Sequence, residues 1–257
     1  MAMALFDLTG KVALVTGASS GLGKRFSLIL AQQGADVVIV ARRLERLKEL
    51  AEEIEAMGRR CMPIKCDAAQ ELQVIETVRK AVSHFGHIDI LVNNAGVADA
   101  GKAEDVSGKD FNKVMAVNVD GVFFFAREVG KSMIQNGYGR IINISSMYGA
   151  VGNKFSPALS YHTSKGAVNN LARALGAEWG RHGITVNNIG PGFFDSEMTG
   201  DFFNTDQFNA YVRNNTCMER TGREDELDTA LLFLAAEESS YITGQTIYVD
   251  GGWTALR

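Results

Sequence analysis

The chain has 257 residues, of which 46% are hydrophobic and 22% charged, an ordinary composition for a globular enzyme. This length suffices for one large domain, and the net charge of −4 argues against a nucleic-acid-binding surface. No apolar run reaches the roughly 18 residues of a membrane span, and residues 1–7 show no signal-peptide pattern, so we expect a cytoplasmic protein. The 3 cysteines and 4 histidines lack disulfide or metal-site spacing, so we predict no metal.

The first predicted strand leads into a glycine-rich turn. Residues 11–16 predict a buried strand, and the turn G-x-x-x-G-x-G follows with Gly17, Gly21 and Gly23. A helical pattern then runs until Gly34. This order is typical of a dinucleotide phosphate site, because glycines let backbone N–H groups approach a pyrophosphate at a helix N-terminus. The loop alone is equally compatible with a simple tight turn.

The second predicted strand, residues 36–40, bears on which cofactor is used. It is followed by Ala41, Arg42 and Arg43. Folds that prefer NAD place an acidic residue there to hold the ribose 2′-hydroxyl. With no carboxylate present and two guanidinium groups available for a 2′-phosphate, we predict that NADP(H) is preferred over NAD(H). Alternatively, both arginines are solvated charges that open the next helix.

The alternation of strands and helices continues to the end of the chain. Further strands are predicted at 61–65, 88–92, 140–144, 184–188 and 246–249, with helices at 44–57, 71–85, 110–133, 164–181 and 225–234. This order predicts an α/β fold: a single-domain, doubly wound parallel sheet of Rossmann type with helices on both faces. We find no internal linker, so we expect one domain over residues 1–257.

Polar residues gather directly after the predicted strands. Asp67 follows the third strand, Asn93 and Asn94 the fourth, and Ser145 and Ser146 the fifth. Ligands of such sheets bind beyond the carboxyl ends of the strands. We therefore expect these side chains to meet at one site.

Tyr161 and Lys165 are spaced four residues apart at the start of a predicted helix. This spacing puts both side chains on one helix face. A free phenol has a pKa near ~10, so a nearby ammonium group would lower it toward a range useful for proton transfer. Alone, the pair is also compatible with an ordinary surface tyrosine and lysine.

Taken together, these motifs resemble the short-chain dehydrogenase/reductase family. The resemblance extends from about residue 8 to residue 253, with the motifs in the family's order. It is carried by Thr16, Gly17, Gly21, Gly23, Asn93, Asn94, Ala95, Gly96, Asn118, Ser146, Tyr161, Lys165, Pro191, Gly192 and the closing Val249, Asp250, Gly251 and Gly252.

The resemblance implies a catalytic set of Asn118, Ser146, Tyr161 and Lys165. Tyr161 would exchange a proton with the substrate oxygen, and Lys165 would lower the tyrosine's pKa and bind the nicotinamide ribose. Ser146 would donate to the substrate oxygen. It is preferred to Ser145 because the family pattern S-x-x-G is met by Ser146 and Gly149. Asn118 would hold a water that links Lys165 to solvent.

The resemblance, with the glycine loop and the arginines, also implies a set of cofactor-binding residues. These are Gly17, Ser19, Ser20, Gly21, Leu22, Gly23, Arg42, Arg43, Asp67, Ala68, Asn94, Ala95, Gly96, Tyr161, Lys165, Pro191, Gly192, Phe194 and Ser196. Asn93 is instead expected to brace the sheet. Two features depart from the family pattern: Ser196 replaces the usual threonine, and the interval from Ser146 to Tyr161 is longer than usual.

The resemblance implies an oxidoreductase that interconverts a secondary alcohol and a ketone. Residues 5–11 and 250–254 resemble the gluconate 5-dehydrogenase-like branch, which suggests a sugar acid or polyol as substrate. Alternatives are a 3-oxoacyl-carrier-protein reductase, a reductase of hydroxysteroids or other hydrophobic ketones, and a non-catalytic cofactor-binding regulator. Family members are usually homotetramers, which we expect here without a membrane or nucleic-acid partner.

A substrate lid is expected at about 195–220. This segment contains Phe202, Phe203, Phe208 and Tyr211. Such aromatic residues can close over a hydrophobic ketone or pack the lid against the body of the protein. The sequence does not separate the two possibilities.

Overall fold

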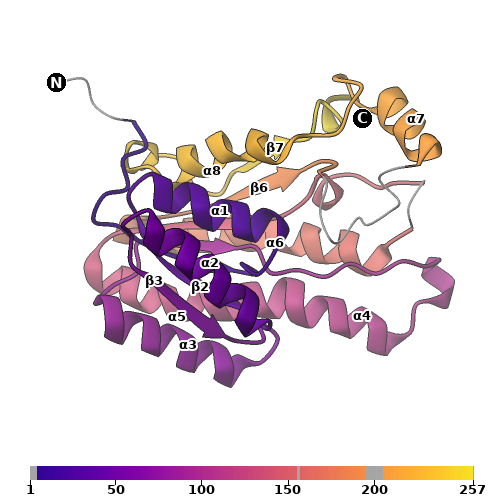
Figure 1. Cartoon of the computed structure of the whole chain (residues 1–257). Coiled ribbons are helices and arrows are strands. Elements are labelled where there is room, and N and C mark those ends of the chain that lie inside the picture. The colour runs from indigo at the N-terminus through magenta and orange to yellow at the C-terminus, as the bar shows by residue number, and fades with distance from the viewer. Residues whose placement is uncertain (1–4, 155–156, 195–204, 257) are drawn as a thin grey trace.

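The computed structural model describes residues 5–154, 157–194 and 205–256. Its sheet has seven parallel strands in the order β3-β2-β1-β4-β5-β6-β7 (Figure 1). The strands are β1 (Val12–Thr16), β2 (Asp36–Ala41), β3 (Cys61–Lys65), β4 (Ile90–Asn93), β5 (Gly139–Ile144), β6 (Ile184–Pro191) and β7 (Thr246–Val249). The helices are α1 (Gly21–Gln32), α2 (Leu44–Ala56), α3 (Glu71–Phe85), α4 (Gly108–Met115), α5 (Gly121–Asn136), α6 (Leu159–Trp179), α7 (Asp206–Asn215) and α8 (Asp228–Ala235). The predicted doubly wound fold is therefore confirmed.

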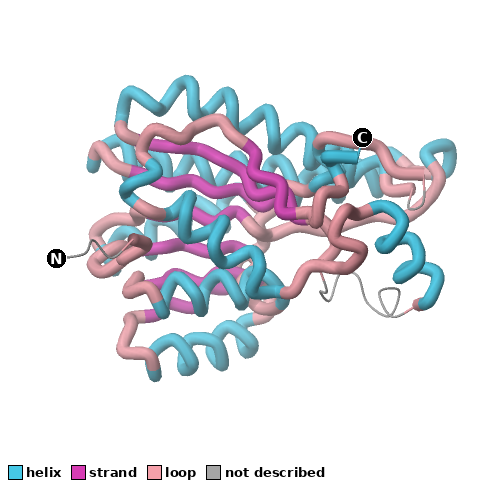
Figure 2. The backbone as a smooth tube through the Cα atoms, turned by 90° about the horizontal axis from the view of Figure 1, so that it is seen from above, coloured by secondary structure: helices cyan, strands magenta, loops and turns pink. Residues whose placement is uncertain are grey.

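Helices cover both faces of the sheet because successive strand residues point to opposite sides. In β1, Ala13 and Val15 face one core, which α1, α2 and α8 complete. Val12 and Leu14 face the second core, which contains side chains of α3, α5 and α6. Viewed from above, the strands lie between these two helical layers, and α7 lies beyond the strand ends beside the C-terminus (Figure 2).

A line of buried side-chain amides crosses the carboxyl half of the sheet. Asn143 of β5 is the register partner of Asn93 of β4 on one side and of Asn188 of β6 on the other. Asn188 is in turn paired with Thr246 of β7. Asn93 Nδ2 donates to Asn143 Oδ1 at 3.0 Å, and Asn143 Nδ2 donates to Asn188 Oδ1 at 3.1 Å. Asn188 Nδ2 then donates to the Thr246 hydroxyl at 2.9 Å. The expectation that Asn93 braces the sheet agrees with this line.

The helix predicted over residues 110–133 is interrupted. A π-helical turn, Ala116–Asp120, separates α4 from α5 and contains the buried Asn118. Such turns are rare and occur frequently at functional sites. Hydrophobic periodicity did not reveal the turn, because a single wider turn displaces the apolar positions only slightly.

Other element boundaries also differ from the prediction. α6 begins at Leu159 rather than at residue 164, so Tyr161 lies in its first turn. β6 extends to Pro191, which was expected just after the strand. The segment expected as a lid contains α7, whose Phe208 is buried against Phe193, with ring centroids 5.2 Å apart. Ser196, Phe202 and Phe203 lie outside the described residues.

Over 5–154, 157–194 and 205–256, no helix is both long and apolar enough to span a bilayer. The same part of the chain holds no cluster of three or more histidine, cysteine, aspartate or glutamate side chains suited to a metal ion.

Candidate active site

A cavity of about 610 Å³ opens at the carboxyl ends of the strands. It lies where the strand order reverses between β1 and β4, the position at which open α/β sheets bind ligands. Every described residue of the predicted cofactor set lines this cavity except Gly23. Of the predicted catalytic set, Ser146, Tyr161 and Lys165 line it, whereas Asn118 lies behind its wall.

The glycine turn after β1 is shaped for close approach of the backbone. Gly17 has a φ of +68°, and a Cβ there would lie 2.9 Å from the Ala95 Cα. A Cβ on Gly23 would lie 2.3 Å from the Gly17 carbonyl oxygen. Gly23 therefore lets α1 pack directly on the turn and does not line the cavity, and its predicted part in cofactor binding stays a prediction. Its contribution is to place the helix N-terminus.

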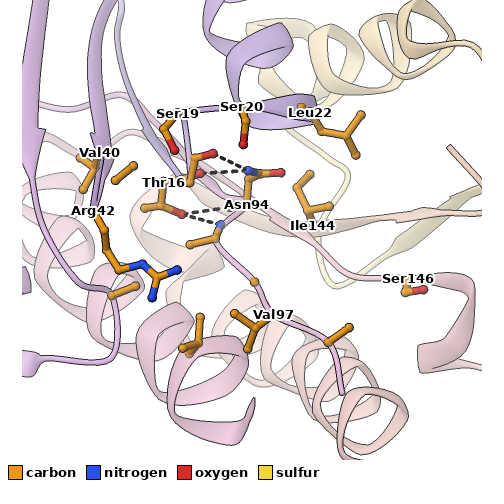
Figure 3. A pocket seen from close by; sticks show the side chains of 18 of the residues that line it. Thr16, Ser19, Ser20, Leu22, Val40, Arg42, Asn94, Val97, Ile144 and Ser146 are labelled. Atoms are coloured by element: carbon orange, nitrogen blue, oxygen red, sulfur yellow. Dashed lines mark hydrogen bonds between the residues drawn. The ribbon is translucent and has the colours of Figure 1, made fainter. Parts of the chain in front are cut away.

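The ends of β1 and β4 are joined by a hydrogen-bond network that the sequence analysis did not identify. The Thr16 hydroxyl accepts the backbone N–H groups of Asn94 and Ala95, each at 3.0 Å. Asn94 Nδ2 donates to the carbonyl oxygens of Thr16 at 3.1 Å and Gly17 at 3.3 Å (Figure 3). Asn94 thus holds the glycine turn in place. In the sequence, this network is indicated only by Thr16, a hydroxyl residue at the end of an otherwise apolar strand.

One end of the cavity is suited to anionic groups. The hydroxyls of Ser19 and Ser20 lie at the N-terminus of α1, whose first turn contains no acidic residue. A helix N-terminus of this kind attracts phosphate. The Arg43 guanidinium donates to the Ser19 hydroxyl at 3.0 Å and to the Ser20 hydroxyl at 2.6 Å. The exposed Arg42 points into the cavity from the end of β2 (Figure 3).

The opposite end of the cavity carries the predicted proton-transfer residues. Tyr161 stands in the first turn of α6, and Lys165 follows one turn later with its amino group 5.4 Å from the centre of the tyrosine ring. Lys165 is buried, and its Nζ donates to the Ile144 carbonyl oxygen at 2.7 Å. Ser146 also lines the cavity here and lowers the pKa of the Tyr161 phenol, so three polar groups meet at this end.

The pKa values at this end correct one expectation. Burial raises the pKa of the Tyr161 phenol above its ordinary value, and the hydrogen bond from Ser146 only partly opposes this change. In the protein alone the net direction is therefore opposite to the predicted lowering, because burial outweighs it, and the contribution of the Lys165 charge to the tyrosine's pKa stays a prediction. Its ammonium group bonds to a backbone carbonyl, and burial lowers the pKa of Lys165 to about 8.

The two neighbouring serines have different surroundings. Ser145 donates to Asn169 Oδ1 at 2.7 Å and is thereby tied to α6, whereas Ser146 is the serine whose side chain affects the pKa of Tyr161. This arrangement agrees with the preference for Ser146 over Ser145.

Asn118 supports the loop after β4. Its Oδ1 accepts the Val97 backbone N–H at 2.8 Å, and its Nδ2 donates to the Val97 carbonyl at 2.8 Å and to the Ser164 hydroxyl at 3.0 Å. Both amide hydrogens are therefore occupied. The side chain thus braces protein segments, and its predicted role in holding a water stays a prediction.

Some residues of the cavity wall lack a distinctive motif and were not predicted from the sequence. Val40, Cys66, Val117 and Ile144 line the cavity alongside Ala41. Apolar residues of this kind give no signal beyond strand or helix periodicity. Cys66 is a buried thiol whose pKa is raised mainly by burial.

The fold and the site together define a dinucleotide-dependent oxidoreductase: a glycine turn and a helix N-terminus face one end of the cavity, and Ser146, Tyr161 and Lys165 face the other. A family model described as enoyl-(acyl carrier protein) reductase matches residues 17–254. A crystal structure of a short-chain type dehydrogenase/reductase from Mycobacterium marinum superimposes with a TM-score of 0.92 at 37% identity, covering 97% of this chain and 98% of that one. The chain belongs to the short-chain dehydrogenase/reductase family.

Two further relatives are similar over almost their whole length. Gluconate 5-dehydrogenase of Gluconobacter oxydans is 38% identical over 251 residues, covering 97% of each protein. The crystal structure of a gluconate 5-dehydrogenase from Burkholderia cenocepacia, in complex with NADP and tartrate, has a TM-score of 0.95 at 35% identity and covers 99% of each chain. The present chain is thus an oxidoreductase similar to gluconate 5-dehydrogenases, and it uses a nicotinamide cofactor.

Proposed function

We propose that this protein is an NADP(H)-dependent oxidoreductase that interconverts a secondary alcohol and a ketone. The observation that carries the proposal is the convergence of Tyr161 and Lys165 with Ser146. Ser146 lies at the end of the cavity opposite Arg42 (Figure 3). The distribution of polar groups along the cavity suits an elongated dinucleotide, with phosphates at the N-terminus of α1 and the nicotinamide beside Tyr161. When bound, the nicotinamide supplies or accepts the hydride.

The protein residues move and stabilise the proton. A raised pKa keeps Tyr161 protonated at neutral pH, which is the form required to donate to a carbonyl oxygen. Ser146 donates a hydrogen bond to the same oxygen as negative charge develops on it. Lys165 carries a positive charge below its pKa of about 8, and this charge stabilises the tyrosinate after proton transfer.

The preference for NADP(H) is supported by the end of β2. Ala41 presents no carboxylate to repel a 2′-phosphate, and Arg42 and Arg43 line the same part of the cavity. The similar protein from Burkholderia cenocepacia was crystallised with NADP. Steady-state kinetics with each cofactor test this preference, and an equal or higher kcat/KM with NAD(H) would overturn it.

We propose a sugar acid or a polyol as the substrate. The similarity to gluconate 5-dehydrogenase supports this class, as does the tartrate, a hydroxy acid, in the Burkholderia structure. A panel followed by NADPH absorbance in both directions tests it with gluconate and 5-ketogluconate, a polyol, an acyl thioester and a steroid ketone. A kcat/KM at least ~10-fold higher for a sugar acid or polyol is expected. A preference for the thioester or the steroid would instead favour the acyl-carrier-protein reductase or the hydrophobic-ketone reductase.

A non-catalytic role as a cofactor-binding regulator is the remaining alternative. Tight NADPH binding without turnover of any panel compound would favour it. The meeting of Ser146, Tyr161 and Lys165 opposes it, because cofactor binding alone does not require a proton donor.

We further propose a homotetramer in the cytoplasm, as family membership implies. Exposed apolar side chains support association: Phe123 and Ile134 on α5, Phe233 on α8, and Tyr241 shortly before β7. Light scattering tests the assembly, and a monomeric mass at micromolar concentration would contradict it.

A further inference from the structure

The catalytic helix α6 begins without a cap of its own. Its N-cap residue is Ala158, which makes no side-chain hydrogen bond to the helix. The first turn of any helix leaves backbone N–H groups without intrahelical partners, and a side-chain oxygen normally satisfies some of them. Alanine has no such oxygen. Because Tyr161 belongs to this first turn, its position depends on how these N–H groups are satisfied.

Asp99 supplies the missing cap from a distant part of the chain. Its Oδ1 accepts the backbone N–H of Tyr161 at 3.1 Å, and its Oδ2 lies 3.3 Å from the backbone nitrogen of Ser160, which donates to it. The three residues belong to two segments about sixty positions apart in the sequence. A carboxylate at a helix N-terminus also interacts favourably with the helix dipole.

The loop that carries Asp99 is fixed on both sides. On one side, Asn118 holds both the N–H and the carbonyl group of Val97. On the other side, the Gly101 N–H donates to the Pro157 carbonyl at 3.1 Å, and Gly101 forms a parallel bridge with Ala158. Asp99 lies between these two anchors, so its carboxylate is presented to α6 by fixed backbone.

We propose that Asp99 is a positioning residue for catalysis, which holds Tyr161 in place by capping α6 from the loop after β4. The inference rests on the proposed function, in which Tyr161 transfers the proton. Lys165 lies one turn further along the helix and has its own bond to the Ile144 carbonyl, so it depends less on the cap. Loss of Asp99 should therefore affect proton transfer more than cofactor binding.

Amide hydrogen exchange tests the cap without requiring activity. In the full-length protein, Asp99→Ala should accelerate exchange in the peptide covering residues 158–165 by about 10-fold, in line with the loss of an N-cap. Asp99→Asn keeps one acceptor oxygen and should stay within about 3-fold of wild type. Asp105→Ala is the matched control, because Asp105 is exposed in the same loop. Unchanged exchange in Asp99→Ala would overturn the proposal.

Kinetics test the consequence for catalysis, with 5-ketogluconate and NADPH as the probes. Asp99→Ala should lower kcat about 10-fold while the Kd for NADPH changes less than 2-fold, and Asp99→Asn should restore kcat to within about 3-fold of wild type. An unchanged kcat, or an equal loss in both variants, would overturn the positioning role. If Asp99→Ala does not fold, Asp99→Ser is used in its place with the same expected outcomes, because its hydroxyl is too short to reach both N–H groups.

Tyr161→Phe is measured alongside and separates the two proposals. An inactive Tyr161→Phe with an unaffected Asp99→Ala would refute only the role of Asp99. An active Tyr161→Phe would refute the proposed function, and the exchange result would still decide whether Asp99 caps α6.

Discussion

The two ends of the cavity are built in different ways. The end near α1 is shaped mainly by backbone: a left-handed glycine and a helix N-terminus form one continuous turn, to which the side chains of Thr16 and Asn94 tie the end of β4. The end near Tyr161 depends on side chains that join distant segments, such as Asp99 with α6 and Asn118 with Val97. We infer that substitutions at the first end change cofactor affinity and stability, whereas substitutions at the second end change kcat.

The largest effect is expected from Tyr161→Phe. Removing the phenolic hydroxyl removes the proton donor, so kcat should fall by at least ~100-fold. The Kd for NADPH, measured by fluorescence titration, should change little because the ring remains. A turnover close to wild type would show that another group transfers the proton and would remove the contrast between the two ends.

At the opposite end, Gly23→Ala should disturb the backbone. The new Cβ would lie 2.3 Å from the Gly17 carbonyl oxygen, so α1 must shift away from the turn. We expect a loss of roughly 1–3 kcal/mol in the free energy of unfolding, as for overpacked sites, and weaker NADPH binding. Gly180→Ala is the control, because a Cβ there meets no atom within 4 Å. Equal melting temperatures for both variants would contradict this account.

A smaller and more selective effect is expected from Arg42→Ala. Loss of a charge-assisted hydrogen bond should raise the KM for NADPH about 10-fold and leave the KM for NADH nearly unchanged. Lys48→Ala removes a positive charge from α2 at an exposed position and serves as the control. If both cofactors lost affinity equally, Arg42 would not contact the 2′-phosphate.

The smallest effect is expected in the pH dependence of the free energy of unfolding. Lys165 has a pKa of about 8 in the folded protein and 10.5 as its ordinary value, so between these values the unfolded chain binds more protons. Stability should therefore rise with pH in this window, by about 1 kcal/mol from pH 8 to pH 9. Denaturant titrations of wild type and Lys165→Met measure this rise as a difference between the two proteins. An identical pH dependence would show that Lys165 is not desolvated.

The sequence predicted the fold and the cofactor end of the site well, because both are encoded locally. Strand periodicity and the spacing of Gly17 and Gly21 identify a strand, a turn and a helix within a few residues of one another. The structure brings nearly all of these residues to one cavity. Gly23 does not line the cavity, and spacing alone does not distinguish a residue that lines the turn from one that lets α1 pack against it.

The reaction end was predicted less completely, because its geometry depends on contacts between distant segments. No sequence pattern indicates that Asp99 caps a helix some sixty residues later, or that the π turn directs Asn118 to Val97. The pKa of Tyr161 was predicted in the wrong direction because burial depends on the whole fold. The spacing of residues along the chain carries no information on how deeply a side chain is buried.

The line of amides from Asn93 to Thr246 has a consequence for how the sheet assembles. Displacing one strand by a single residue would turn its asparagine toward the core that α1, α2 and α8 complete and leave its neighbours' amides unpaired, at a cost of several hydrogen bonds. Purely aliphatic strands would tolerate such a slip far better. The asparagines therefore discriminate against misaligned pairings while the chain is folding, and so help ensure that the loops carrying the reactive groups arrive opposite one another.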